Sequence, residues 1–251
     1  MDAVRPRISP DGTPESAWAA WPGLGQLREV GAREIVPPGA RAVVVAPHPD
    51  DEVLMVGGLL AQLARGTADI QVIAVTDGSA SHGGSRIWPP ARLRQERPKE
   101  SQAALRCLGV AGLPLRLDLP DGGLMARRAC LAQRLAASIE ATDVVFTTWH
   151  GDGHPDHEAT ALACQAAAAA RGARLIEVPV WAWNWAHPGD PRLPWRHALR
   201  LPLDSDATRR KRLAVQAFTS QIVPDRSTGA APILGADMLE RAARPYEVLF
   251  P

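Results

Sequence analysis

Three adjacent carboxylates follow a short apolar run in the first fifth of the chain. The run Val-Val-Val-Ala at residues 43–46 leads through Pro47 into the motif HPDDE at residues 48–52. A β-branched run of this length predicts a buried parallel strand, so the polar groups should lie at its carboxyl end, where open α/β sheets bind ligands. Three like charges beside a core repel one another and lose hydration unless a cation or hydrogen-bond donors compensate. The cluster therefore indicates a divalent metal site.

A second polar cluster follows another apolar run. The run at residues 143–149 leads, after a turn that contains glycines, into the motif HPDH at residues 154–157. Pro155 suits the first turn of a helix. His154 and His157 are three positions apart, so both side chains should face the same way on that turn.

The two motifs meet at one edge if both strands belong to the same parallel sheet. His48, Asp51 and His157 would then supply two nitrogens and one oxygen, and three protein ligands leave a position open for water, as in catalytic zinc sites. Spacing alone does not rank His154 and His157 as ligands, because both project from one turn. Without a metal, Asp51 and Glu52 could instead be the N-cap and first-turn acids of the following helix. That alternative leaves the neighbouring carboxylate unexplained.

Together the two motifs resemble those of the PIG-L/LmbE-like zinc-dependent N-deacetylases. Further matches to the family are Thr76-Asp77-Gly78, the segment from Arg97 to Glu100, and Lys211 with Ser220-Gln221. The resemblance therefore covers most of the chain beyond residue 40. It implies a Rossmann-like fold and hydrolysis of an acetamide, usually on an amino sugar.

The resemblance also implies a role for each motif residue. His48, Asp51 and His157 resemble the zinc ligands, and Asp50 resembles the general base that deprotonates the water. Zinc, or another divalent ion, can lower the pKa of a bound water to about 7. His154 matches the position that stabilises the tetrahedral intermediate, and a protonated imidazole would be a suitable charged donor.

Asp156, inside the second motif, is a candidate to orient one of the two histidines without itself binding the metal.

Three residues are candidate substrate contacts. Asp77 leaves the second strand at the same edge, although a plain turn residue would look the same. Arg97 could reach a sugar hydroxyl or a phosphate, or form an ion pair with Glu96 or Glu100. Trp183 belongs to an alternating run of tryptophans, which as an extended strand would present one set of rings to a sugar or an acyl group. The same rings could also plug the sheet edge or form a subunit contact.

The elements that must position these residues alternate along the chain. Strands are predicted near residues 42–47, 70–76, 114–119, 144–149 and 175–181, and helices near residues 53–65, 91–108, 126–140 and 158–171. This alternation predicts an α/β, Rossmann-like fold with a mostly parallel sheet and helices on both faces. A nicotinamide site is excluded, because HPDDE stands where the GxGxxG backbone cradle would be required.

Composition predicts one domain over residues 1–251, with residues 1–38 as an N-terminal extension. The net charge of +1 gives no global field for nucleic acid or an anionic membrane, and no apolar run reaches the roughly 18 residues of a transmembrane helix. The N-terminus lacks the apolar region of a signal peptide. The three scattered cysteines suggest reduced, buried thiols in a cytoplasmic protein. A homo-oligomer is compatible with the sequence.

We therefore expect a zinc-dependent hydrolase that removes an acyl group, acetyl by the resemblance, from the nitrogen of a small molecule that contains an amino sugar. One alternative is an amidase acting on a thiol conjugate or a longer acyl amide. Another is a catalytically silent module that binds metal or carbohydrate. Asp50 and His154 argue against this last alternative, because a module that only binds needs no uncoordinated base beside the metal.

Overall fold

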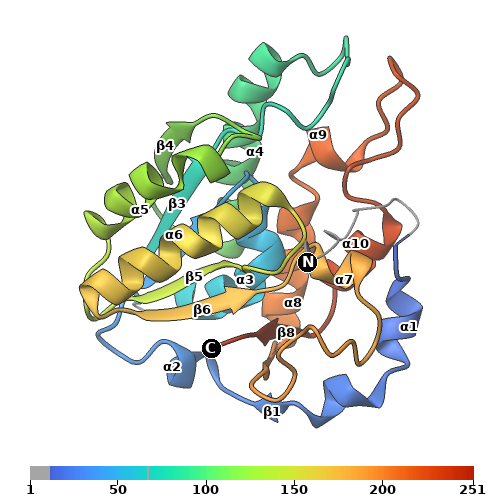
Figure 1. Ribbon diagram of the computed structural model, residues 1–251. Coiled ribbons are helices and arrows are strands. Elements are labelled where there is room, and N and C mark those ends of the chain that lie inside the picture. The colour runs from blue at the N-terminus through green and yellow to red at the C-terminus, as the bar shows by residue number, and fades with distance from the viewer. Residues whose placement is uncertain (1–11, 67) are drawn as a thin grey trace, which may run out of the picture.

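A five-stranded parallel sheet forms the centre of the protein (Figure 1). The computed structural model describes residues 12–66 and 68–251. The strands are β2 (Ala42–Ala46), β3 (Ile70–Thr76), β4 (Leu115–Leu119), β5 (Val144–Thr148) and β6 (Arg174–Val178). They lie in the order β4-β3-β2-β5-β6, and every neighbouring pair is parallel. The carboxyl ends of β2 and β5 therefore lie side by side at one edge.

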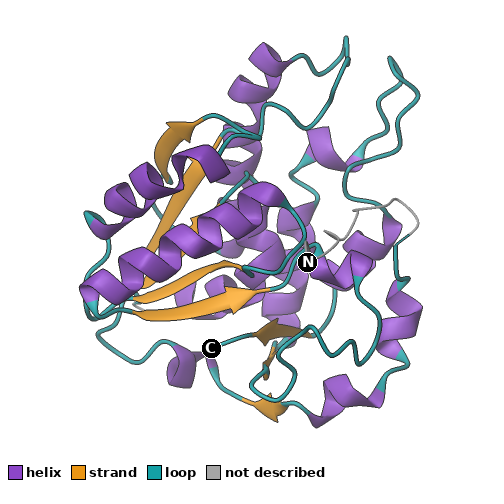
Figure 2. Cartoon of the chain, in the orientation of Figure 1, coloured by secondary structure: helices purple, strands orange, loops and turns teal. Residues whose placement is uncertain are grey.

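Helices cover both faces of this sheet (Figure 2). The larger helices are α3 (Asp51–Ala64), α4 (Pro90–Leu108), α5 (Arg128–Ala136), α6 (Pro155–Arg171) and α8 (Ser205–Val215). Val44 and Phe146 belong to a core with residues of α3, α4 and α8, whereas Val43 and Val145 belong to a second core with residues of α5 and α6. Successive strand residues point to opposite faces, so one apolar run supplies both cores. In Figure 1, α5 and α6 lie on the viewer's side of the sheet.

A second, smaller sheet was not predicted from the sequence. It contains β1 (Arg28–Glu29), β7 (Leu199–Pro202) and β8 (Tyr246–Leu249) in the order β1-β7-β8, with β8 antiparallel to β7. The remaining short elements are α1 (Glu15–Ala19), η1 (Pro22–Gln26), α2 (Ala32–Ile35), η2 (Met125–Arg127), α7 (Ala182–Trp185), α9 (Thr219–Ile222) and α10 (Ala236–Ala242). A third apolar cluster, which includes Trp18, Trp183 and Phe250, lies among these short elements.

The α/β fold class and the parallel sheet were predicted correctly, but three local predictions were wrong. The tryptophan-rich segment is not an extended strand: β6 ends at Val178, and the chain turns into the short helix α7. The helix predicted at 126–140 begins as the 3₁₀ turn η2 and continues as α5 only to Ala136. Of the cysteines, Cys164 is buried but Cys130 is exposed, and all three are free thiols. Residues 1–11 of the predicted extension lie outside the described residues.

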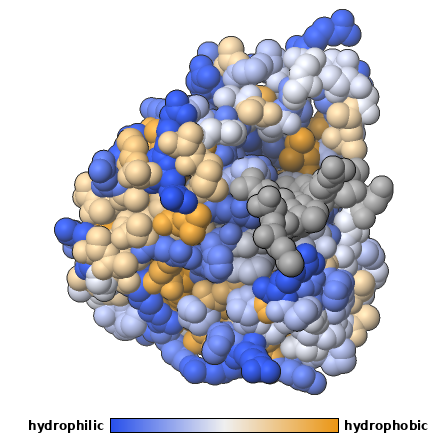
Figure 3. All heavy atoms as spheres, in the orientation of Figure 1, coloured by the Kyte–Doolittle hydropathy of each residue, from blue (hydrophilic) through white to orange (hydrophobic). Residues whose placement is uncertain are grey.

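Over α5 and α6 the surface shows both hydrophilic and hydrophobic residues (Figure 3). This is expected for helices that pack one face against a sheet and expose the other. In the described part of the chain, no helix combines the length and the apolar character needed to cross a membrane.

Candidate active site

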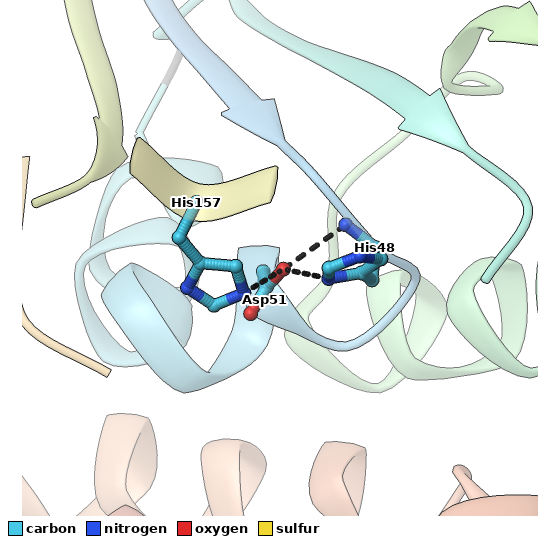
Figure 4. Close-up of side chains that lie close together, drawn as sticks. All are labelled: His48, Asp51 and His157. Atoms are coloured by element: carbon cyan, nitrogen blue, oxygen red, sulfur yellow. Dashed lines mark hydrogen bonds and ion pairs between the residues drawn. The ribbon is translucent and has the colours of Figure 1, made fainter. Parts of the chain in front are cut away.

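The three predicted metal ligands come together at the carboxyl edge of the sheet. His48 lies in the turn after β2, Asp51 is the first residue of α3, and His157 lies in the first turn of α6 (Figure 4). Asp51 Oδ2 lies 3.2 Å from His48 Nδ1 and 3.3 Å from His157 Nε2. One ligand atom from each residue falls within 4.8 Å of the others, and all three side chains are buried.

An unpartnered nitrogen supports a metal at this point. His157 Nε2 is buried and has no hydrogen-bond partner among the described residues. The other ring nitrogen, Nδ1, lies 2.7 Å from Asp152 Oδ2, so the neutral ring with its proton on Nδ1 would offer the lone pair of Nε2 to a metal. Two imidazole nitrogens and one carboxylate oxygen form a donor set that fits zinc or a similar divalent ion.

The pKa values of these groups indicate that a metal ion would replace protons on the histidines. Burial lowers the pKa of His157, but the carboxylates of Asp51 and Asp152 outweigh it and raise this pKa to about 9. Burial likewise opposes ionisation of Asp51, yet the neighbouring imidazoles of His157 and His48 hold the pKa of Asp51 well below its usual value. Without metal, protons on the histidines balance the carboxylate. A bound cation would take their place.

Asp152 orients His157, and sequence reasoning did not single it out. Its side chain is fully buried and accepts the backbone N–H groups of Val180, Trp181 and Ala182 at 2.8 to 2.9 Å. These bonds fix the carboxylate from the loop that follows β6. The only signal in the sequence is an acid between two glycines just before the HPDH motif.

His48 is oriented by two further acids. Its Nε2 lies 3.2 Å from Asp121 Oδ1 and 3.5 Å from Asp156 Oδ2. Asp156 also accepts the backbone N–H groups of Gly122 and Leu124. Asp156 was predicted to orient one of two histidines from outside the ligand group, and its carboxylate lies beside the ring of His48. Asp121 was not predicted, because nothing local distinguishes it from a turn residue.

Asp50, the predicted general base, has a buried side chain and a strained backbone conformation. Its φ of 135° lies in a region that L-residues rarely adopt. Its N–H donates to Glu52 at 3.0 Å, and Arg97 Nη2 donates to its Oδ2 at 3.0 Å. Burial raises the pKa of Asp50 to about 7, although the positive charge of Arg97 opposes the shift. The structure thus holds a carboxyl group with a near-neutral pKa beside Asp51.

Arg97 was predicted as a substrate contact or as a partner of Glu96 or Glu100. Its side chain is buried and bonds to Asp50, while also donating to the carbonyls of Pro49 and Gly78. The ion-pair alternatives were wrong. Glu100 accepts from the N–H and hydroxyl of Ser220 instead.

His154 caps α6 and is neutral. Its Nδ1 accepts the N–H of Asp156 at 3.2 Å, which leaves the ring proton on Nε2. Burial, followed by the positive charges of His157 and His48, lowers the pKa of His154 to about 4. A ring with this lowered pKa offers one neutral N–H donor, whereas the resemblance suggested a charged one. Its centroid lies 4.7 Å from that of His157.

A cavity of about 440 Å³ opens onto these side chains. Its polar part includes His48, Asp50, Asp51, Arg97, Asp121, His154 and His157, and its apolar part includes Leu54, Trp181, Ile233, Leu234 and Met238. The cavity has both reactive groups and an apolar wall.

Two predicted substrate contacts lie outside this cavity. Asp77 instead accepts two hydrogen bonds from Arg116 Nη2, at 2.7 and 2.8 Å. Trp183 is buried against Trp18, with ring centroids 4.9 Å apart. Trp183 lies outside the cavity because the turn into α7 directs it into the third apolar cluster. The same turn leaves Trp181 at the cavity.

Comparisons with known proteins agree with this geometry. The model of the PIG-L family, GlcNAc-PI de-N-acetylase, matches residues 43–168, half of the chain. A 1D-myo-inositol 2-acetamido-2-deoxy-alpha-D-glucopyranoside deacetylase of Corynebacterium kroppenstedtii is 31% identical over 147 residues, which cover 46% of this chain and 37% of that protein. The chain thus spans well under two thirds of that relative.

Two solved structures are similar over most of the chain. A deacetylase from the biosynthesis pathway of teicoplanin is 25% identical, with a TM-score of 0.63, and the match covers 84% of this chain and 97% of that chain. A conserved protein of Thermus thermophilus is 28% identical, with a TM-score of 0.58, over 81% of this chain and 84% of that chain.

Proposed function

This chain belongs to the PIG-L family, and we propose that it is a metal-dependent hydrolase that removes an acetyl group from the nitrogen of an amino sugar. The observation that carries the proposal is the buried group of His48, Asp51 and His157, with an unpartnered Nε2 on His157, beside the uncoordinated carboxyl group of Asp50. A site that only bound a metal would not need that fourth group.

In this proposal, His48 Nδ1, Asp51 Oδ2 and His157 Nε2 hold a divalent ion, most simply zinc. When bound, the ion would polarise the amide carbonyl and lower the pKa of water to about 7. Asp50 accepts the proton of the attacking water, because its near-neutral pKa allows it to take up the proton and later give it to the leaving amine. Arg97 keeps the Asp50 carboxylate in place during both transfers.

His154 then stabilises the developing oxyanion. With Nδ1 accepting from the helix backbone, its Nε2–H is the free donor, and His154 lines the same cavity as the ligand group. Oxyanion sites commonly use uncharged N–H donors, so a neutral imidazole is suitable here. Removing one such donor typically lowers turnover by about 10²- to 10³-fold.

The substrate class is inferred from relatives and from the cavity. The corynebacterial relative is named for an acetamido sugar, and the solved relative for a step in teicoplanin biosynthesis. The volume of about 440 Å³ leaves room for a sugar ring besides the acetamide. A longer acyl amide is the second candidate, because the apolar wall of Leu54, Trp181 and Met238 could receive its chain.

The test is metal analysis followed by release of free amine. The protein should bind about one equivalent of Zn²⁺ after chelator treatment and reconstitution, and it should release amine from N-acetyl amino sugars. N-acyl amino sugars with longer chains, assayed in parallel, separate the two candidates. Metal and sugar binding without amine release would instead indicate a binding module.

A further inference from the structure

Helix α3 is interrupted shortly after Asp51. Val56 has φ −136° and ψ 25°, outside the helical region, so two helical segments meet there. In an unbroken helix the N–H groups of Gly58 and Leu59 would donate to carbonyls four residues earlier. The interruption frees these donors and the carbonyl of Leu54, and each buried backbone group needs a new partner.

Two buried charged side chains supply these partners. Glu247 of β8 accepts from the N–H of Gly58 at 2.7 Å and of Leu59 at 3.0 Å, one with each oxygen. Lys211 of α8 donates from Nζ to the carbonyl of Leu54 at 3.2 Å and to Glu247 Oε1 at 2.7 Å. Glu247 and Lys211 are each 4% exposed. The pair therefore replaces hydrogen bonds that the broken helix has lost.

The segment before the break carries part of the candidate active site. Asp51 is its first residue, and Leu54, whose carbonyl Lys211 holds, lines the cavity. Beyond the break, the second segment packs directly against Leu203, whose side chain fills the space that a Cβ at Gly58 would occupy. The angle at the break thus decides where the first segment points.

Stability alone does not account for this arrangement. Desolvation offsets most of the attraction in a buried ion pair, and well-packed apolar residues are often as stabilising. A continuous helix would also satisfy the same backbone groups without any charge. What Glu247 and Lys211 add is a defined break.

We propose that Glu247 and Lys211 form a positioning pair for the metal site. By stabilising the break at Val56, they set the direction in which Asp51 faces His48 and His157. The inference rests on the metal centre of the proposed function, and the experiment is arranged so that the two can fail separately.

The experiment is a Zn²⁺ titration of the full chain in competition with a chromophoric chelator, at a temperature where circular dichroism shows each variant folded. The variants are Glu247→Gln, Lys211→Met and the double change Glu247→Leu with Lys211→Met. The matched control is Glu15→Gln, which breaks another buried ion pair, with Arg244, at side chains 10% and 7% exposed.

Zinc affinity should fall about 10- to 100-fold in Glu247→Gln and Lys211→Met, the range typical for residues that orient a ligand. In Glu15→Gln the thermal midpoint should fall while zinc affinity stays unchanged. The double variant should regain stability, because without the charged pair a continuous helix can satisfy the same backbone groups beside apolar side chains, but its zinc affinity should stay low.

Unchanged affinity in the single variants, or recovery of affinity together with stability in the double variant, overturns the positioning role. If none of the three variants folds while Glu15→Gln does, the pair serves core stability and the inference fails. A wild-type chain that binds no Zn²⁺ or other divalent ion overturns the metal centre as well. Wild-type binding with unaffected variants leaves that centre standing.

Discussion

Replacing Asp152 by asparagine should change the proton position on His157. The amide oxygen can take the place of Oδ1, which accepts from Val180 and Ala182. The NH₂ group then stands where Oδ2 accepted from Trp181 and His157. It donates to Nδ1 of His157, so the ring proton moves to Nε2 and the lone pair no longer faces Asp51.

The size of both effects follows from these contacts. Loss of a group that orients a metal ligand typically lowers affinity about 10- to 100-fold. The N–H of Trp181 also loses its buried acceptor, which costs about 1–3 kcal/mol of unfolding free energy. For a chain of this size, that corresponds to a fall of about 2–12 °C in the thermal midpoint of the metal-free protein.

Zinc competition titration and thermal unfolding of the metal-free chain measure the two quantities separately, since bound metal would itself raise the midpoint. Asp190→Asn is the control, because Asp190 is equally buried but bonds to Arg192. It should lower stability and leave zinc affinity unchanged. If Asp152→Asn bound zinc as tightly as the wild type, the orienting role of Asp152 would be refuted.

Three further changes test the remaining assignments. Asp50→Asn should keep zinc bound and lower turnover in the amine-release assay by about 10²- to 10⁴-fold. Asp51→Asn should instead weaken zinc binding in the titration. If the two variants showed the opposite effects, the roles of base and ligand would be contradicted. His154→Ala should lower turnover about 10²- to 10³-fold with zinc affinity retained, and loss of metal would make it a ligand. Trp181→Ala should raise KM with little change in stability. Trp183→Ala should lower the free energy of unfolding, measured with denaturant, by about 3–5 kcal/mol and leave KM unchanged. Equal effects of the two changes on KM would place both rings at the substrate.

Local pattern was sufficient for the fold class, and together with the family resemblance it identified the central ligand group. Runs such as Val43 to Ala46 are buried on both faces of a parallel sheet, and the alternation with helical segments is visible over short stretches of sequence. The motifs HPDDE and HPDH follow β2 and β5, and His48, Asp51 and His157 meet because these two strands are parallel neighbours in the sheet. The second sheet was missed because its strands are two to four residues long and lie far apart in the chain.

Only the tertiary structure decided which groups orient and surround that ligand set. Asp152 is bound by Val180, 28 positions away, and Glu247 completes a helix break at Gly58, 189 positions away. Trp183, one of the candidate substrate contacts, is turned into an apolar cluster by one short helix. Periodicity and turn chemistry are properties of neighbouring residues, whereas these contacts depend on the path of the whole chain. No spacing rule in the sequence encodes them.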